Sequence, residues 1–249
     1  MSSPALASSD ELWCVLLAAG ESRRLGYPKQ LVRDPVRPLI LRAVDAAQAV
    51  APDRLLVVLG AHSLRLRTLL SRNYGGMRIV NNAHWQDGIA SSLRAGVGAV
   101  PRQASGVLIV LTDQPGVNAS SLGRLTAAWR RHPSRAVAAG YGNGPGVPAI
   151  LPRRLLRGLR ELQGDMGAKA VLSEGGSNTL LVDMPEAAFD VDTSEDLSRL
   201  TYGSSSSDFS RSFYPRPLRR FPPVSLSSPR GRLGSVLSSR SEHAASTRR

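Results

Sequence analysis

The sequence has almost no cysteine, since Cys14 is the single cysteine among 249 residues. One thiol cannot form an internal disulfide, and the cysteine and four histidines do not have the spacing of zinc ligands. A disulfide-stabilised secreted domain and a structural zinc site are therefore not expected. We expect a protein of a reducing compartment, with the cytoplasm as the default location.

Long hydrophobic runs are also missing. The one run that resembles an export signal, Leu12 to Gly20, is too short to cross a bilayer. It follows Asp10 and Glu11, whereas basic residues precede the apolar part of a signal peptide. We expect this run to be a buried strand, and we expect no membrane partner.

Lysine is rare as well, because only Lys29 and Lys169 are lysines among 32 basic residues. Lysine provides a compact, rotatable charge of the kind that phosphate sites use. The net charge of +13 is uneven, since residues 203–249 hold nine arginines against Asp208 and Glu242. The remaining positive charge suits a protein that handles phosphates, and arginines on solvated faces explain it equally well.

Buried strands alternate with amphipathic helices over residues 11–202. Continuous apolar runs predict strands, and apolar spacings of three and four predict helices. The alternation predicts an α/β fold with a doubly wound, mostly parallel, Rossmann-like sheet, whose ligands bind at the carboxyl ends of the strands. The expected strands are 12–17, 55–59, 77–80, 107–111, 136–139, 179–182 and 189–191. The expected helices are 39–50, 64–70, 89–97, 118–129, 152–162, 167–172 and 194–200, the last with Ser194 as its cap and Asp196 as the acid of a capping box, and residues 140–148 are expected to form a loop.

Residues 1–10 and 203–249 lie outside this pattern. The first segment is small and polar, and the second holds fourteen serines and five prolines without a helical or strand period. Such segments cannot bury enough apolar surface to fold alone. We therefore interpret residues 11–202 as one domain between a disordered lead-in and a disordered basic tail. The tail is better explained as an incidental extension than as a nucleic-acid-binding arm.

A glycine-rich loop follows the first expected strand. It runs from Leu17 to Lys29 and includes the hydroxyl of Ser22 and the guanidinium of Arg24. Glycines let backbone N–H groups approach phosphate oxygens, and arginine and lysine neutralise phosphate charge. The spacing is neither that of a Walker A loop nor that of a dinucleotide-binding loop. On chemistry alone, a phosphate cradle and a plain surface loop are even alternatives.

The loop resembles the signature of molybdenum cofactor cytidylyltransferases and related nucleotidyltransferases. The matching pattern is Leu17-Ala18-Ala19-Gly20-x-Ser22-x-Arg24-x-Gly26-x-Pro28-Lys29. Later matches, in order and spacing, are Asn81 to Gly96, Asp113-Gln114-Pro115, Gly164 to Ala168 and Asp190 to Leu197. The resemblance covers about residues 12–200. It implies Mg²⁺-dependent transfer of a nucleoside monophosphate from an NTP to a phosphorylated acceptor, with release of pyrophosphate.

The resemblance also implies roles for individual residues. Arg24, Lys29 and Asp113 are the expected catalytic residues, the first two as ligands of the triphosphate. Asp113 and Asp192 are expected to bind Mg²⁺, and Asp190 is a further candidate because residues two apart on a strand share a face. Without the resemblance, a turn residue and a helix cap are the better interpretations of Asp113 and Asp192. The expected nucleotide contacts are Leu17, Ala18, Ala19, Gly20, Ser22, Arg24, Lys29, Asn82, Gly88 and Ser92.

The resemblance also suggests the substrates. CTP is favoured because Ala18-Ala19-Gly20 resembles the cytidylyl branch more than the guanylyl branch. Molybdopterin is the favoured acceptor, with a molybdoenzyme or its chaperone as a candidate partner. Thr112, Val36 and Val147 depart from the family pattern, and Val147 leaves the acceptor open. The alternatives are a sugar-phosphate or other small-phosphate nucleotidyltransferase, and a non-catalytic nucleotide- or cofactor-binding protein of the same fold.

Overall fold

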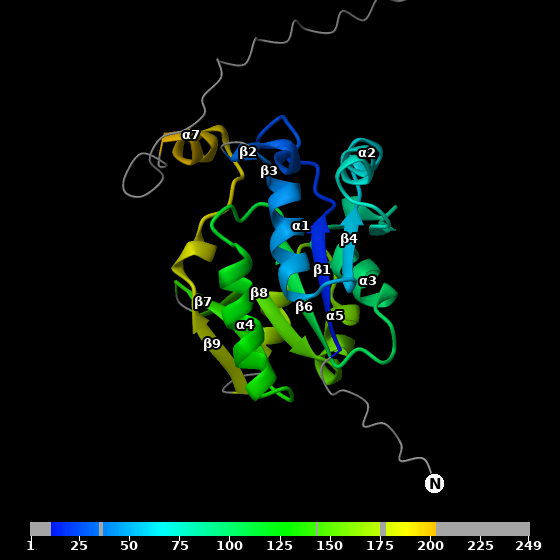
Figure 1. Ribbon diagram of the computed structural model, residues 1–249, viewed down its shortest axis with the longest axis vertical. Coiled ribbons are helices and arrows are strands. Elements are labelled where there is room, and N and C mark those ends of the chain that lie inside the picture. The colour runs from blue at the N-terminus through cyan, green and yellow to red at the C-terminus, as the bar shows by residue number, and fades with distance from the viewer. Residues whose placement is uncertain (1–10, 35–36, 143, 175–177, 203–249) are drawn as a thin grey trace, which may run out of the picture. The chain divides into compact units, whose positions relative to one another are not determined.

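The computed structural model describes residues 11–34, 37–142, 144–174 and 178–202 (Figure 1). The segments 1–10 and 203–249, which we expect to be disordered, lie outside the described residues, so that expectation and the domain bounds stay predictions. No helix in the described ranges is long and apolar enough to cross a membrane.

A seven-stranded sheet forms the centre of the described chain. Its strands are β1 (Leu12–Ala18), β4 (Leu55–Leu59), β5 (Arg78–Asn81), β6 (Gly106–Leu111), β7 (Ala136–Tyr141), β8 (Gly144–Pro152) and β9 (Thr179–Asp183). Their order across the sheet is β5-β4-β1-β6-β8-β7-β9. Strand β8 runs antiparallel to β6 and β7, and the other neighbouring pairs are parallel. The predicted mostly parallel, doubly wound sheet is therefore confirmed. A small separate sheet pairs β2 (Arg33–Asp34) with β3 (Arg37–Pro38).

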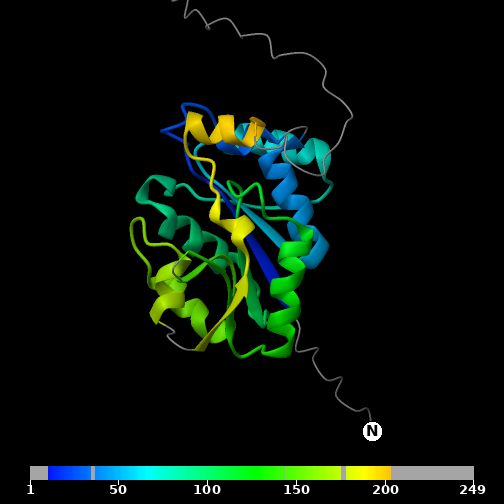
Figure 2. The ribbon, with the colours of Figure 1, turned by 90° about the vertical axis from the view of Figure 1, so that its left-hand side faces the viewer.

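Helices cover both faces of the sheet (Figure 2). The α-helices are α1 (Leu39–Val50), α2 (Ser63–Asn73), α3 (Ile89–Ala99), α4 (Ala119–Arg131), α5 (Leu156–Glu161), α6 (Ala168–Glu174) and α7 (Ser194–Tyr202). Short 3₁₀ helices are η1 (Lys29–Leu31), η2 (Trp85–Asp87), η3 (Arg153–Leu155) and η5 (Pro185–Ala188). Helices α1, α2 and α4 pack on one face, and α3, α5 and α6 pack on the other.

Strand β1 shows why the sheet centre is a continuous apolar run in the sequence. Successive side chains of a strand point to opposite faces. Cys14 and Leu16 therefore enter the core beneath α1 and α4, while Val15 and Leu17 enter the core beneath α3. Because both faces are covered, every residue of β1 is buried.

Residues 140–148 do not form the predicted loop. Their glycines and prolines indicated irregular structure, but most of them belong to the hairpin of β7 and β8, in which Tyr141 lies opposite Gly144. The pairing register of β7 with β8 shifts between Ala138 and Ala139, as at a β-bulge. Tertiary pairing has overridden the local signal of glycine and proline.

Two expectations near the end of the domain are also wrong. Residues 189–191 do not form the predicted strand, because this stretch belongs to none of the strands in the described sheet. Thr193, rather than Ser194, caps helix α7. The Thr193 hydroxyl accepts from the Asp196 N–H at 3.3 Å, and the Asp196 carboxylate accepts from the Thr193 N–H at 2.9 Å. Asp196 therefore supplies the acid of a capping box, as predicted, but the capping residue is Thr193 and not Ser194.

Candidate active site

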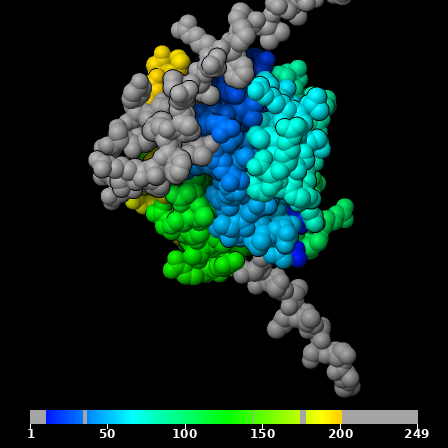
Figure 3. Space-filling model, turned by 45° about the horizontal axis from the view of Figure 1, so that its top comes forward, coloured from blue at the N-terminus to red at the C-terminus, as the bar shows by residue number. Residues whose placement is uncertain are grey.

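The predicted site residues lie where strands β1 and β6 end. These strands are parallel neighbours, with Leu17 opposite Leu111. The loop after β1 and the Asp113 turn after β6 therefore begin at the same edge of the sheet, which is the ligand-binding edge of doubly wound folds. Seen from this end of the molecule, α1 (blue) and α2 (cyan) lie side by side at the surface (Figure 3).

The loop after β1 folds back on Ser22. The Ser22 carbonyl accepts hydrogen bonds from the N–H groups of Leu25 and Gly26, each at 3.1 Å. The Ser22 hydroxyl accepts from the N–H of Lys29 at 3.0 Å. Ser22 has a φ of 64°, an uncommon value for a residue with a side chain. The turn brings Lys29 back toward the strand ends, at the start of η1.

The carbonyl oxygens at the start of this loop, from Ala18 to Ser22, are all bonded to protein groups. The Gln30 amide nitrogen donates to the carbonyls of Ala18 and Gly20, at 3.2 and 2.8 Å. The Ala19 carbonyl accepts from the N–H of Ala61 at 3.1 Å, and the Glu21 carbonyl from the ring of His62 at 3.0 Å.

The backbone N–H groups of residues 20–24 have no hydrogen-bond partner within the described chain. The exposed guanidinium of Arg24 likewise makes no ion pair or hydrogen bond there. A loop with bonded carbonyls and free N–H groups offers donors to an anion. This arrangement favours the phosphate cradle over the plain surface loop.

Lys29 joins two of the expected metal ligands. Its ammonium lies 2.5 Å from Asp113 Oδ2 and 2.7 Å from Asp192 Oδ1. The side chains of Lys29 and Asp113 are only 16% and 14% exposed, while that of Asp192 is 47% exposed. Burial lowers the pKa of Lys29, but the carboxylates of Asp113 and then Asp192 outweigh this effect and hold the pKa above its ordinary value. The ammonium therefore stays charged.

Asp190 belongs to the same cluster. Partial burial, followed by repulsion from Asp113 and Asp192, raises the pKa of Asp190 to about 6, although the residue keeps contact with solvent. The backbone explains the convergence, since the Val191 N–H donates to the Asp113 carbonyl at 2.9 Å. Val191 itself is fully buried. The three aspartates thus meet through this bond, and not through the shared strand face that the sequence analysis assumed.

The carboxylates fit a hard divalent cation in one respect. Asp113 Oδ1 is buried and has no hydrogen-bond partner among the described residues, so one oxygen of a buried carboxylate is available. The described residues contain no group of three or more acidic, histidine or cysteine side chains arranged to hold a metal by themselves. Mg²⁺ sites often combine one or two carboxylates with substrate phosphates, and Asp113 with Asp192 matches that pattern.

Asn82 and Ser92 are expected nucleotide contacts whose side chains bond to each other. Both are buried, and the Asn82 amide donates to the hydroxyls of Ser91 and Ser92 at 2.8 and 3.0 Å. The expected contacts Leu17, Ala18 and Ala19 also have buried side chains, which leaves only their backbone for a ligand.

Gly88 packs against the loop that begins at Gly164. Its φ is 88°, and a Cβ at this position would overlap the Gly164 carbonyl oxygen. The Ala90 N–H donates to that same carbonyl at 3.1 Å. The structure thus gives Gly88 a packing role, and its assignment as a nucleotide contact stays a prediction, as do those of Asn82 and Ser92.

Two buried glutamines beside the site were not among the expected site residues. Gln30 is 1% exposed and bonds to the loop after β1. Gln114 donates to the carbonyls of Val147 and Ala187, at 3.0 and 2.8 Å. Tyr141 donates to the same Val147 carbonyl at 3.0 Å. Gln114 stands in the matched Asp113-Gln114-Pro115 motif, which gave it no role of its own, and the only signal for Gln30 was that it directly follows Lys29.

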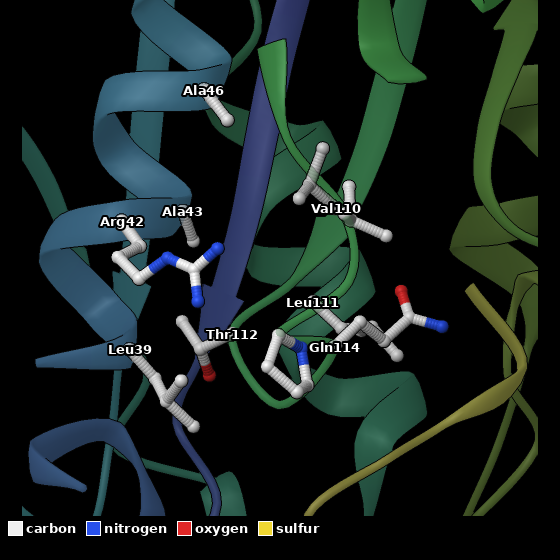
Figure 4. A pocket seen from close by; sticks show the side chains of 10 residues that line it. Leu39, Arg42, Ala43, Ala46, Val110, Leu111, Thr112 and Gln114 are labelled. Atoms are coloured by element: carbon white, nitrogen blue, oxygen red, sulfur yellow. The ribbon is translucent and has the colours of Figure 1, made fainter. Parts of the chain in front are cut away.

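A small pocket lies behind the Asp113 turn, between α1 and the end of β6 (Figure 4). Its polar lining includes Arg42, Thr112 and Gln114. Arg42 forms an ion pair with Asp34, and burial lowers the pKa of the Arg42 guanidinium. The Thr112 hydroxyl donates to the Leu17 carbonyl at 3.2 Å, which ties β6 to β1. The hydrogen bond of Thr112, the residue before Asp113, helps to fix the turn that holds Asp113.

Comparisons with known proteins agree with this geometry. The family described as "MobA-like NTP transferase domain" matches residues 14–182. The nicotine blue oxidoreductase of Paenarthrobacter nicotinovorans is 33% identical over 199 residues, which are 75% of this chain and 94% of that protein. The structure of Rv0371c from Mycobacterium tuberculosis H37Rv is 28% identical with a TM-score of 0.68, covering 78% of this chain and 98% of that chain. A structure of Rv0371C in complex with manganese is 26% identical with a TM-score of 0.62, covering 76% and 97%.

Proposed function

Because the chain belongs to the MobA-like NTP transferase family and is a nucleotidyltransferase, we propose that it transfers CMP from CTP to a phosphorylated acceptor and releases pyrophosphate. Molybdopterin is the acceptor that we favour, and a molybdoenzyme or its chaperone is the partner that would receive the product. The reaction would take place in the cytoplasm.

The observation that carries the proposal is the position of Lys29. Its ammonium bridges Asp113 and Asp192, and its backbone N–H bonds to Ser22 in the loop with free N–H groups. One residue thus connects the proposed phosphate cradle to the carboxylates. A triphosphate in the cradle would compete with the two aspartates for the ammonium, and Lys29 needs only to rotate its side chain to reach it.

The proposed reaction is a single displacement. An anionic oxygen of the acceptor phosphate attacks the α-phosphorus of CTP, a new P–O bond forms, and the bond to the bridging oxygen of the β-phosphate breaks. Pyrophosphate leaves with the electron pair of that bond. No proton has to be removed from the acceptor phosphate, since it is already ionised at neutral pH. Lys29 and Arg24 would neutralise the charge that develops on the leaving group, and the loop N–H groups would orient the phosphates.

Divalent metal binding is typical of this family, and the manganese complex of Rv0371C is an example among its relatives. We propose Mg²⁺ as the ion used here, with Asp113 and Asp192 as its ligands and Asp190 as a further candidate. A bound Mg²⁺ would supply charge neutralisation and Lewis-acid polarisation at the phosphates. The buried, unpartnered Oδ1 of Asp113 supports this assignment.

Measurement of pyrophosphate release tests the proposal. The purified full chain would be supplied with each of the four NTPs and Mg²⁺, with and without molybdopterin. We expect release only with the acceptor and fastest with CTP. Pyrophosphate release with a sugar phosphate in place of molybdopterin would favour a sugar-phosphate nucleotidyltransferase. Binding of an NTP without any release of pyrophosphate would favour the non-catalytic alternative.

The relative named as an oxidoreductase motivates one further arm of this experiment, since the identity to it extends over 94% of its length. The same preparation would be mixed with NAD(P)H and a quinone-type dye. Oxidation of the nicotinamide in the absence of pyrophosphate release would favour a redox function over the one that we propose.

A further inference from the structure

The loop after β1 has an unusual distribution of hydrogen bonds. The five consecutive carbonyl oxygens from Ala18 to Ser22 all accept bonds from protein groups, and the N–H groups of residues 20–24 donate to none of the described residues. A carbonyl oxygen that faced a triphosphate would repel it, because both are electron-rich. Holding these carbonyls inward is therefore a requirement for the anion binding that the proposed function assumes.

Gln30 holds two of the five carbonyls with one side chain. Its amide nitrogen has two hydrogens, and it donates to Ala18 and Gly20, the carbonyls on either side of Ala19. The backbone at Ala19 is also fixed, since its carbonyl accepts from Ala61. These bonds set the orientation of the peptide planes at the point where β1 becomes the loop.

The other end of the Gln30 amide has no partner. Its oxygen is buried and accepts no hydrogen bond in the described structure. A buried unsatisfied acceptor is unfavourable for folding, and an apolar side chain of similar volume would avoid it. The side chain is thus better explained by its two donated bonds to the loop than by a contribution to the core.

Gln30 is also adjacent to Lys29 on the short helix η1. The two side chains diverge, since Lys29 reaches the carboxylates and Gln30 reaches the strand end. We infer that Gln30 is a positioning residue for the nucleotide, an inference that rests on the proposed function. It turns the carbonyls of Ala18 and Gly20 away from the triphosphate, so that the start of the loop presents its N–H groups. It is not expected to touch the substrate.

The chain offers a matched control in Gln114. This glutamine is also buried, also donates its amide to two carbonyl oxygens, and also has an unpartnered amide oxygen. Its two partners, Val147 and Ala187, lie outside the loop after β1. Replacement of either glutamine by methionine removes the same chemistry at nearly constant volume. Only the change at Gln30 should alter the affinity for a triphosphate.

The test uses inorganic triphosphate as the probe, since it reports on the cradle without any contribution from a base. Its affinity for the full chain would be measured calorimetrically in the presence of EDTA, for wild type, Gln30→Met, Gln30→Glu and Gln114→Met. We expect about tenfold weaker binding for Gln30→Met, which corresponds to the loss of two modest hydrogen bonds. Gln30→Glu should bind more weakly still, because an ionised carboxylate cannot donate and would repel both the carbonyls and the probe. Gln114→Met should stay within about twofold of wild type.

Thermal unfolding of each variant separates positioning from stability. The inference predicts that Gln30→Met and Gln114→Met unfold at similar temperatures while their triphosphate affinities differ. Equal affinities of Gln30→Met and wild type would overturn it, as would a loss of folding in both Gln30 variants. Failure of wild type to bind triphosphate would overturn it as well. The proposed function fails by a different result, namely the absence of pyrophosphate release by wild type.

Discussion

The ammonium of Lys29 lies 2.5 Å from the carboxylate of Asp113, although the two residues are 84 positions apart in the sequence. Both groups are largely buried, and their opposite charges compensate each other. In the absence of nucleotide, Lys29 therefore occupies oxygens that a divalent ion would need. Nucleotide and metal binding should depend on each other through this lysine.

The first prediction concerns Lys29→Met. Removal of the ammonium should lower the rate of nucleotidyl transfer by about 10²-fold or more, since the charge on the leaving pyrophosphate loses a partner. The same variant should bind free Mn²⁺ more tightly than wild type when no nucleotide is present, because Asp113 and Asp192 lose their competing cation. Electron paramagnetic resonance of free Mn²⁺ measures this directly. Weaker Mn²⁺ binding by the variant would contradict the competition.

The second prediction distinguishes the two candidate partners of Asp113. Asp192 contacts Lys29, whereas Asp190 interacts with the cluster through its charge. We expect Asp192→Asn to weaken Mn²⁺ binding in the presence of CTP by about tenfold or more, which corresponds to the loss of one charged ligand. Asp190→Asn should have a smaller effect. The reverse order would assign the second metal ligand to Asp190.

The third prediction concerns pH. In the folded protein, burial and then repulsion from Asp113 and Asp192 raise the pKa of Asp190 from its ordinary value of 3.8 to about 6. A carboxyl with a raised pKa binds its proton more tightly in the folded state, so its contribution to stability falls as the pH rises through this interval. In the presence of EDTA, Asp190→Asn should be more stable than wild type above pH 6, by about 1 kcal/mol after allowance for solvent contact.

Urea unfolding of both proteins at pH 4 and pH 7.5 checks this pH dependence. The advantage of Asp190→Asn should be present at pH 7.5 and much smaller at pH 4, where wild-type Asp190 is largely protonated in the folded protein. An advantage of the same size at both pH values would show that the charge of Asp190 is not its cause.

The fourth prediction concerns Gly88, which has a positive φ and packs against the Gly164 carbonyl. Gly88→Ala should destabilise the fold by about 2–3 kcal/mol, because the new Cβ overlaps that carbonyl and the backbone conformation becomes strained. Gly98→Ala is the control, in helix α3, which begins directly after Gly88. Among the described residues, no atom outside its own helix backbone lies within 4 Å of a Cβ at Gly98, so alanine there should be neutral or stabilising by up to about 1 kcal/mol. Equal effects of the two substitutions in urea unfolding would be incompatible with this account.

The sequence predicts the sheet well because its central strands are buried on both faces, as the continuous run from Leu12 to Ala18 illustrates. It fails where tertiary pairing overrides local signals, as at the hairpin that includes Gly144. The chemistry of Lys29 and Asp113 follows from their motifs, and their contact confirms that the motifs converge.

The role of Gln30 could not be predicted in the same way. A glutamine after Lys29 has no distinguishing pattern, and its two hydrogen bonds exist only because η1 returns to the end of β1. The convergence of Asp190 with Asp113 was expected for the wrong reason, because it depends on a backbone bond at Val191 and not on a strand. Contacts that arise from the return of the chain have no periodic signature in the sequence.

The central claim is that the site around Lys29 and Asp113 transfers a nucleoside monophosphate. Its most direct test uses CTP that carries ³²P at the α-phosphate. The labelled CTP is incubated with Mg²⁺, molybdopterin and either wild type or Asp113→Asn, and the transfer of the label to molybdopterin is measured. The account predicts that wild type moves the label to the acceptor and that Asp113→Asn, which loses one expected metal ligand, moves almost none. Absence of label in the acceptor with wild type, or undiminished transfer by Asp113→Asn, would contradict it.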